Sequence, residues 1–258
     1  MLVDWQLQES QTNFARFRDL NLEIDTSFNF STESKGRDPD SHSPTLRKYH
    51  SLLWSKELPS GEHLHVEDIN SELMYRFDMQ TLKFSSDSIS NSYIGTNKVA
   101  HLKDQIPQAE FEEFRNKGLT IGGYTIFPST RIDGTMTLNG ARGLNSKIGD
   151  RFDLTLECIR LHYLHRDSPL EENLSSRVNR FFFSLFQDFT GYVEFFLLQD
   201  LVDPSFEKVK FFTETKTPFE NSPIPKTAAE YREYKHATLE FVDARNNRIN
   251  DWCKANSL

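Results

Sequence analysis

The sequence has few cysteines, no long apolar segment and no secretory signal. Its two cysteines, Cys158 and Cys253, indicate a reducing compartment rather than a disulfide-stabilised fold. The most apolar run, residues 192–202, is interrupted by Glu194 and Asp200 and is too short to span a bilayer. The N-terminus has neither the basic nor the apolar region of a signal peptide. We therefore expect a soluble, cytoplasmic protein with no membrane partner.

Concentrated positive charge and several standard catalytic motifs are also missing. The formal net charge is −8 and no Lys/Arg-rich run occurs, which makes nucleic acid an unlikely partner. The phosphate-binding patterns GxxxxGK[ST] and GxGxxG are absent, as is the nucleophile motif GxSxG. Cys158 lies in an apolar helical pattern, so we expect a buried and unreactive thiol. Nucleophilic catalysis has little support.

Periodicity divides the chain into a β-containing part and a helical part. We expect a helix from Pro44 to Trp54 capped by Ser43, a helix over residues 108–118, and an exposed loop over residues 31–44. Short segments rich in β-branched or aromatic residues predict strands at residues 64–69, 73–77, 82–89 and 119–128.

The second half is predicted to be mainly helical. Apolar spacing indicates helices over residues 150–166 and 171–189, and either a helix or a buried strand over residues 190–201. Thr227 with Glu230 forms a capping box for a long terminal helix. The fold class is therefore α+β, with a small mixed or antiparallel sheet in the first half packed against a mainly helical second half. We expect a single domain over residues 1–258, with its β-containing part at about 25–140 and its helical part at about 150–258.

The predicted helix at residues 150–166 carries a stripe of charge on an apolar background. Asp150, Asp153, Glu157 and Arg160 recur at steps of three, four and three, so they share one helical face. Closely spaced carboxylates favour acid/base chemistry or binding of a hard cation such as Mg²⁺. The alternative is a buried network of ion pairs in which Arg151 or another basic residue neutralises the acids.

The loop that precedes this helix is rich in glycine and basic residues. Arg131, Asn139, Arg142 and Lys147 suit an anionic group, because arginine binds phosphate or carboxylate with two parallel hydrogen bonds. The alternative is an ordinary group of turns whose arginines pair with the striped helix. A further group, Arg47, His50 and Trp54, shares a face of the early helix, and without a second His or Cys at ligand spacing it does not predict zinc.

Several segments together resemble a known family. These segments are KGRDPDSHSPTLRKYHSLLWSKELPSG, LKFSSDSISNSYIG, TLNGARG, IGDRFDLTLECIRLHY and FQDFTGYVEFFLLQDLV. They resemble uncharacterised bacterial proteins that are classed as a domain of unknown function, and the resemblance covers roughly residues 28 to 250. It implies one unit of this size and brings no known activity or site residues with it.

Two hypotheses of function follow. The first is an enzyme that acts on a phosphorylated or nucleotide-like small molecule, with the cofactor undecided and Mg²⁺ as one option. Its catalytic residues would be Asp153 and Glu157. Its binding residues would be Arg131, Asn139, Arg142, Lys147 and Arg160. The second is a non-catalytic binding or regulatory module with a protein partner in a stress or phage-defence context. A weaker third is a nucleotide-transferring or ADP-ribosylating toxin, suggested by Arg47, His50 and the Ser85–Ser88 run.

Overall fold

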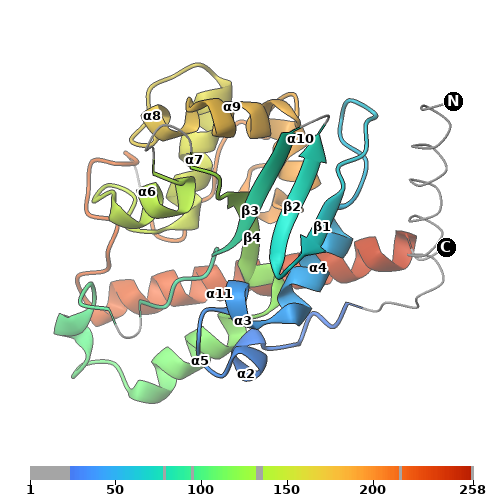
Figure 1. Cartoon of the computed structure of the whole chain (residues 1–258). Helices are drawn as coiled ribbons and strands as arrows, with labels where there is room; N and C mark the ends of the chain where they lie inside the picture. The colour runs from blue at the N-terminus through green and yellow to red at the C-terminus, as the bar shows by residue number, and fades with distance from the viewer. Residues whose placement is uncertain (1–23, 78–79, 94–95, 132–135, 215–216, 257–258) are drawn as a thin grey trace, which may run out of the picture.

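A four-stranded antiparallel sheet lies at the centre of the molecule (Figure 1). The computed structural model describes residues 24–77, 80–93, 96–131, 136–214 and 217–256. The strands follow one another in space as they do in sequence, which confirms the antiparallel alternative. They are β1 (Val66–Ile69), β2 (Glu72–Phe77), β3 (Gln80–Ser88) and β4 (Tyr124–Pro128).

Helices of the first half lie beside and below this sheet. The capping prediction for α4 is confirmed, since the Ser43 hydroxyl accepts a hydrogen bond from the Leu46 N–H at 3.2 Å. The loop expected over residues 31–44 is wrong, because Asn29 and Asp38 cap two short helices within it. The helices are α2 (Phe30–Ser34), α3 (Pro39–His42), α4 (Pro44–Trp54), η1 (Ala100–Leu102), α5 (Gln108–Gly118) and η2 (Ile121–Gly123).

The second half is helical, as predicted. The single helix expected over residues 171–189 is wrong: the chain turns at Ser175, and Ser176 starts a new helix by accepting a hydrogen bond from the Asn179 N–H. The helices are α6 (Leu138–Leu144), α7 (Phe152–Tyr163), α8 (Glu171–Leu174), α9 (Arg177–Ser184), α10 (Phe189–Phe195), η3 (Gln199–Leu201) and α11 (Ala228–Asn256).

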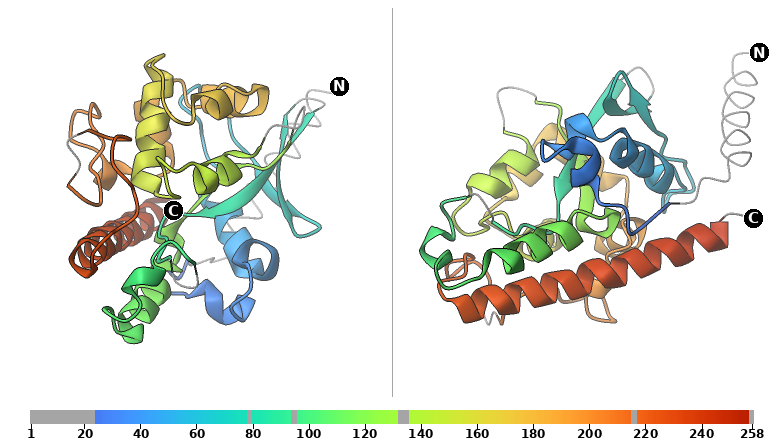
Figure 2. Two further views of the ribbon diagram at one scale, coloured as in Figure 1. Left: turned by 90° about the vertical axis from the view of Figure 1, so that its left-hand side faces the viewer. Right: turned by 90° about the horizontal axis from the view of Figure 1, so that it is seen from below.

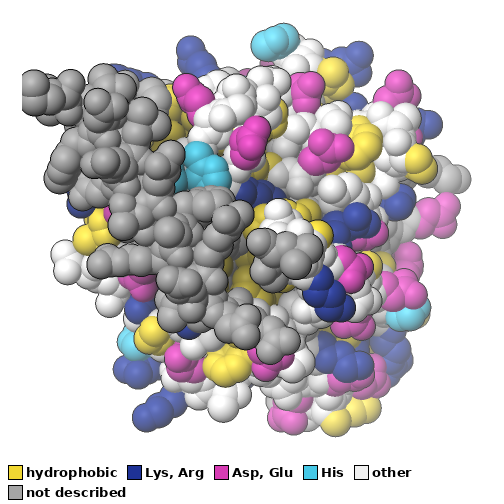
Figure 3. Space-filling view, turned by 90° about the vertical axis from the view of Figure 1, so that its right-hand side faces the viewer, with side chains coloured by type: hydrophobic (Ala, Val, Ile, Leu, Met, Phe, Trp, Pro, Cys, Tyr) yellow, Lys and Arg dark blue, Asp and Glu magenta, His cyan; other side chains and the backbone are white. Residues whose placement is uncertain are grey.

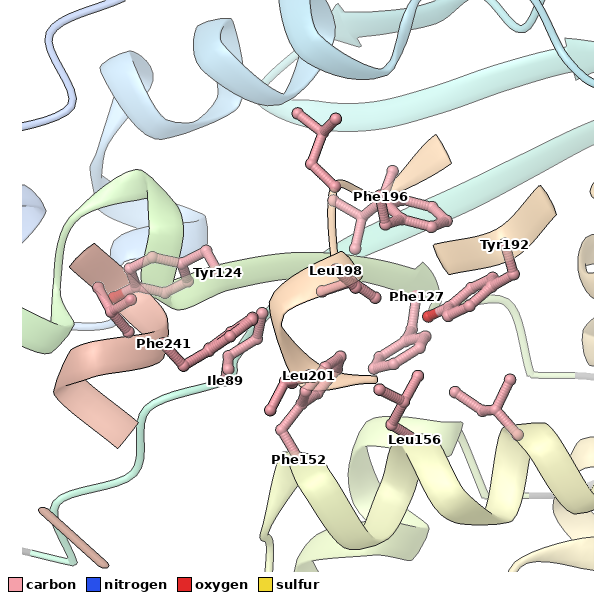
Figure 4. Packing of buried hydrophobic residues seen from close by; sticks show 14 of the residues in the cluster. Ile89, Tyr124, Phe127, Phe152, Leu156, Tyr192, Phe196, Leu198, Leu201 and Phe241 are labelled. Carbon is pink, nitrogen blue, oxygen red and sulfur yellow. The ribbon is translucent and has the colours of Figure 1, made fainter. Parts of the chain in front are cut away.

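Both faces of the sheet are covered by helices. Successive residues of β3 point to opposite faces, so Ser86 meets His50 of α4 while Asp87 meets Arg142 of α6. On the α7 side, Phe152 and Leu156 point towards the apolar residues of β4 and η3 (Figure 4). Residues of both halves belong to one hydrophobic cluster, and the single domain stays a prediction.

The terminal helix α11 runs along one side of the molecule beside α5 (Figure 2). Tyr231 and Tyr234 donate hydrogen bonds to the carbonyls of Ser92 and Asn91 at 2.9 and 3.1 Å. Further along, Arg245 is fully buried and donates to backbone carbonyls of α10 and of the η2–β4 segment. The last helix therefore ties together segments that lie more than a hundred residues earlier in the chain.

Charges of both signs are mixed on the surface. The face shown in Figure 3 has Lys/Arg and Asp/Glu side chains interspersed wherever described residues are visible. Within the described part of the chain, no helix combines the length and apolar character needed to cross a membrane.

Candidate functional site

The predicted catalytic residue Asp153 lies in a closed ion pair in the first turn of α7. Its side chain is fully buried, and Arg151 donates from Nε to Oδ1 at 3.0 Å and from Nη2 to Oδ2. The backbone N–H of Phe212 donates to Oδ2 at 2.9 Å, and Arg151 also donates to Thr213 at 2.8 Å. Both carboxylate oxygens are therefore engaged by groups of the chain itself.

The second predicted catalytic residue, Glu157, is paired one turn further along α7. Arg160 donates from Nε to Oε2 at 2.8 Å and from Nη2 to Oε1 at 2.7 Å, which is a bidentate geometry. The two side chains are 8% and 16% exposed. A residue predicted to catalyse and a residue predicted to bind substrate thus neutralise each other on the face that periodicity assigned to them.

Arg142 connects α6 to the start of α7, and α6 occupies residues 138–144 of the segment that was expected to be a loop. Its buried guanidinium donates to Asp87 at 2.5 Å, to the Thr155 hydroxyl at 3.1 Å and to the Asp150 carbonyl at 2.9 Å. Burial raises the pKa of Asp87 to about 6, although Arg142 opposes that rise. Asp150 precedes the helix in a left-handed conformation with φ +71°, so it leaves the helical stripe and faces Arg142 instead.

The other three predicted binding residues lie apart from these pairs. Arg131 and Lys147 are exposed, and Asn139 is half-buried in the first turn of α6. The hydrogen bonds and ion pairs of the described residues join none of the three to Asp153 or Glu157. Residues 132–135 of the same predicted loop lie outside the described residues. The seven-residue site stays a prediction.

A buried polar chain connects α4 to β3. The Trp54 indole donates to His50 Nδ1 at 2.9 Å, and His50 Nε2 lies 2.9 Å from the Ser86 hydroxyl. Because an indole N–H can only donate, Nδ1 is the acceptor and Nε2 carries the proton that is given to Ser86. Burial, with a contribution from Arg245, lowers the pKa of His50 to about 3. A neutral His50 in this tautomer cannot accept the Ser86 proton, so the pair is no catalytic dyad.

A cavity of about 240 Å³ lies where the α2–α3 turn meets the end of α5 and the segment that follows β3. The lining side chains include two arginines, Arg37 and Arg115, and a group of small polar residues. The latter are Ser31, Ser88, Ser90, Asn91 and Ser92. Within the described chain, no carboxylate forms a salt bridge with Arg115. The cavity therefore combines positive charge with several hydrogen-bonding groups.

Local hydrogen bonds hold each wall of this cavity in place. The Phe30 N–H donates to the Leu119 carbonyl at 3.0 Å, which joins α2 to the end of α5. Gly36 has φ +74°, and a side chain there would be 3.6 Å from the Arg115 guanidinium, so the turn packs directly against it. Opposite, the Ser90 hydroxyl donates to the Gly118 carbonyl at 2.7 Å. Figure 1 shows α2, α3 and α5 next to one another below the sheet.

The cavity is connected to Asp150 and Arg142 through one residue, Asn91. Asn91 lines the cavity and donates from its side-chain amide to the Asp150 carboxylate at 2.5 Å. Asp150 in turn faces Arg142, at 3.6 Å. The Asp150–Arg142 pair thus supports one wall of the cavity through Asn91.

Sequence reasoning did not identify the residues of the cavity. Arg37 was part of an expected exposed loop, and Arg115 is an ordinary polar position of an amphipathic helix. One usable signal was the dense group of small polar residues in SSDSISNS, which begins at Ser85 within a strand pattern and contains a single apolar residue, Ile89. The long-range contact between α2 and α5 is not visible in local periodicity.

Metal binding has no geometric support within the described residues. No group of three or more His, Cys, Asp or Glu side chains is arranged to hold an ion there. The carboxylates considered for Mg²⁺, Asp153 and Glu157, each have an arginine as their direct partner.

The comparisons with known proteins agree with the extent of the resemblance noted above. The model of a family of unknown function (DUF6994) matches residues 24–249. Searches of curated proteins and of solved structures find no significant match.

Proposed function

The chain belongs to this family of unknown function, and we propose from its geometry that it binds a small anionic molecule in the cavity between Arg37 and Arg115. The observation that carries the proposal is the presence of two guanidinium groups at one cavity, one of them without an acidic partner among the described residues. Arginine matches phosphate and carboxylate geometry with two parallel donors.

The neighbouring small polar side chains suit the same ligand. Hydroxyl groups of Ser31, Ser88 and Ser90 and the amide of Asn91 can turn donors towards anionic oxygens. The hydroxyls of Ser31, Ser88 and Ser90 donate to other groups of the chain, so each would exchange its present acceptor for an anionic oxygen. The Asn91 amide donates one of its two hydrogens to Asp150 and keeps the other for a ligand. An anion would then be held mainly by the arginines and oriented by the smaller groups.

The size of the cavity limits the ligand. Sites for drug-sized molecules occupy roughly 300–1,000 Å³, whereas this cavity has about 240 Å³. It is large enough for a phosphate or carboxylate group with a small attached body. A larger, nucleotide-like molecule would place only its anionic end inside.

Anion binding at Arg115 requires fewer rearrangements of this structure than catalysis by Asp153 and Glu157 would. An enzyme that uses Asp153 and Glu157 would first have to separate them from Arg151 and Arg160. Removal of one partner from a buried pair is strongly unfavourable. A binding or regulatory module needs no such step, because Arg115 forms no salt bridge with a carboxylate of the described residues.

Isothermal titration calorimetry with inorganic phosphate, pyrophosphate and adenosine monophosphate tests the proposal. We expect at least one to bind, and Arg115→Gln to weaken it about 10- to 100-fold, since a charge-assisted hydrogen bond contributes about 1.5–3 kcal/mol. Arg115 has no ion-pair partner in the described structure, so the variant should fold normally.

The matched control replaces the exposed residues of the sequence-predicted site. Arg131→Gln/Lys147→Gln removes two positive charges outside the cavity and should leave the affinity unchanged apart from a small long-range effect. The opposite pattern, with affinity lost in this variant and kept in Arg115→Gln, refutes the cavity and favours the loop. Absence of binding by all three anions refutes the proposal in its present form.

A further inference from the structure

Lys56 occupies a fixed position just after α4. The Lys56 carbonyl accepts a hydrogen bond from the Leu64 N–H at 3.0 Å. The preceding residue, Ser55, is held by the Val66 N–H, which donates to its hydroxyl at 2.8 Å. Hydrogen bonds from Leu64 and Val66 therefore hold the chain at Lys56 and at the residue before it. The Lys56 side chain takes part in neither bond.

That side chain places its amine among three aromatic rings from three different helices. Lys56 Nζ lies 5.4 Å from the ring centroid of Trp54, 4.7 Å from Phe195 and 5.0 Å from Trp252. These rings, which we call the aromatic cage, belong to α4, α10 and α11. Lys56 and Trp252 are both half-buried, so the cage retains a side that is open to solvent.

The surroundings of the amine contain a second cation, Arg245, and one ionisable thiol, Cys253, whose interaction with the amine raises the pKa of Lys56. The Arg245 guanidinium lies 5.6 Å from the centroid of the same Trp54 ring. Its hydrogen bonds go to backbone carbonyls of Phe196, Gly122 and Tyr124. Among the described residues, no carboxylate forms a salt bridge with either side chain. The protonated amine is therefore disfavoured both by removal from water and by repulsion.

Burial and the nearby Arg245 lower the pKa of Lys56 to about 7. The faces of the aromatic rings act in the opposite direction, because they attract a cation. A lysine in an apolar pocket next to another cationic group is the arrangement that makes an amine nucleophilic at neutral pH.

We propose that Lys56 is a reactive amine that forms an imine with a small aldehyde or ketone inside the aromatic cage. The lone pair of Nζ attacks the carbonyl carbon while the C=O π electrons move to oxygen. Proton transfer gives a carbinolamine, and loss of water then leaves the C=N bond. No oxidant or reductant is required. The flat apolar walls select a carbonyl compound with an apolar body, and this site is separate from the Arg37–Arg115 cavity.

Reductive methylation of the whole protein with limiting formaldehyde and cyanoborohydride tests the proposal, with peptide mapping by mass spectrometry. An ordinary lysine amine, with a pKa near 10.4, is unprotonated in only about one molecule in 2,500 at pH 7. Steric hindrance and the weaker basicity of Lys56 make its unprotonated amine less reactive than that of an exposed lysine. Because a larger fraction of Lys56 is unprotonated, we still expect its labelling at pH 7 to be at least ~10-fold faster than that of exposed Lys35. The rate at Lys56 should level off above pH ~8, whereas that at Lys35 keeps rising.

Two variants separate reactivity from simple exposure. Trp252→Ala removes one wall of the cage and admits water, so the amine becomes more accessible but also more basic. We expect its labelling at pH 7 to fall relative to Lys35; a rise would show that access alone governs the rate and would refute the proposal. Equal labelling of Lys56 and Lys35 in the wild-type protein would also refute the proposal. Arg115→Gln should leave Lys56 labelling unchanged, which keeps this result independent of anion binding.

Discussion

Replacement of Asp153 with asparagine distinguishes a structural ion pair from a catalytic carboxylate. The change preserves the shape of the side chain and removes its charge, which leaves the nearly buried Arg151 guanidinium, 4% exposed, without its anion. Loss of one partner of a buried pair destabilises a protein by about 3–5 kcal/mol. Typical unfolding free energies are about 5–15 kcal/mol, so this is a large fraction of the total.

Glu157→Gln is the matched comparison on the same helix. Its pair with Arg160 is less enclosed, with the arginine side chain 16% exposed. We expect a loss of about 1 kcal/mol, near the upper end for partly exposed pairs. With a urea dependence of about 3 kcal/mol per molar, Asp153→Asn should lower the urea midpoint by about 1–1.7 M and Glu157→Gln by about 0.3 M.

The assay is equilibrium urea unfolding followed by circular dichroism, with the slope compared across variants. The double variant Arg151→Met/Asp153→Asn removes both charges and should lose less than the sum of the two single variants, by about 2 kcal/mol. If Asp153→Asn unfolds within about 0.5 kcal/mol of the wild type, the closed pair is refuted as a stabilising element. The catalytic hypothesis for Asp153 would then regain its main argument.

Three further measurements test other parts of the structure. His50 stays neutral in the folded state down to about pH 3, while an unfolded histidine binds a proton below about pH 6.5, so stability falls as the pH falls through this window. His50→Gln should make the slope of unfolding free energy between pH 6 and 4 shallower by about 1.4 kcal/mol per pH unit, and an unchanged slope would contradict the buried neutral histidine. Thr227→Ala removes the hydroxyl that accepts the Glu230 N–H at 3.2 Å and should lower the unfolding free energy by about 1 kcal/mol; an unaltered urea midpoint would argue against this cap. Gly36→Ala, at φ +74°, should lower the unfolding free energy by about 1 kcal/mol, whereas Gly143→Ala within α6 should leave it unchanged or raise it. Equal effects of the two variants on the melting temperature would contradict the left-handed turn.

Local patterns predicted the elements of the fold better than they predicted its site. Ser43 and Pro44 start α4, and the helix expected over residues 108–118 has those bounds in the structure. The alternation of β3 also identified a strand, because a side-chain period of two depends only on near neighbours. The helix break at Ser175 was missed, because neither glycine nor proline stands at the break and its two residues are both serine.

The candidate cavity depends on contacts that no local pattern contains. Arg37 and Arg115 lie 78 residues apart in sequence and are brought together when α2 docks on the end of α5. Of the charged stripe, Asp153, Glu157 and Arg160 lie in α7, whereas Asp150 precedes the helix. Arg151 pairs with Asp153 and Arg160 with Glu157, but the spacing of the residues alone did not decide between such ion pairs and an open site.

The position of α11 has a consequence for how the protein is made. Its Tyr231, Tyr234 and Arg245 supply hydrogen bonds to segments that leave the ribosome more than a hundred residues earlier. Until α11 has left the ribosome, those carbonyls lack these donors and the aromatic surface beneath α11 is exposed. We therefore expect nascent chains that stop before Ala228 to be cleaved readily by protease and to need chaperones, and chains that include α11 to become resistant once this helix can fold. Protection of the shorter chains would show that the first 227 residues fold on their own.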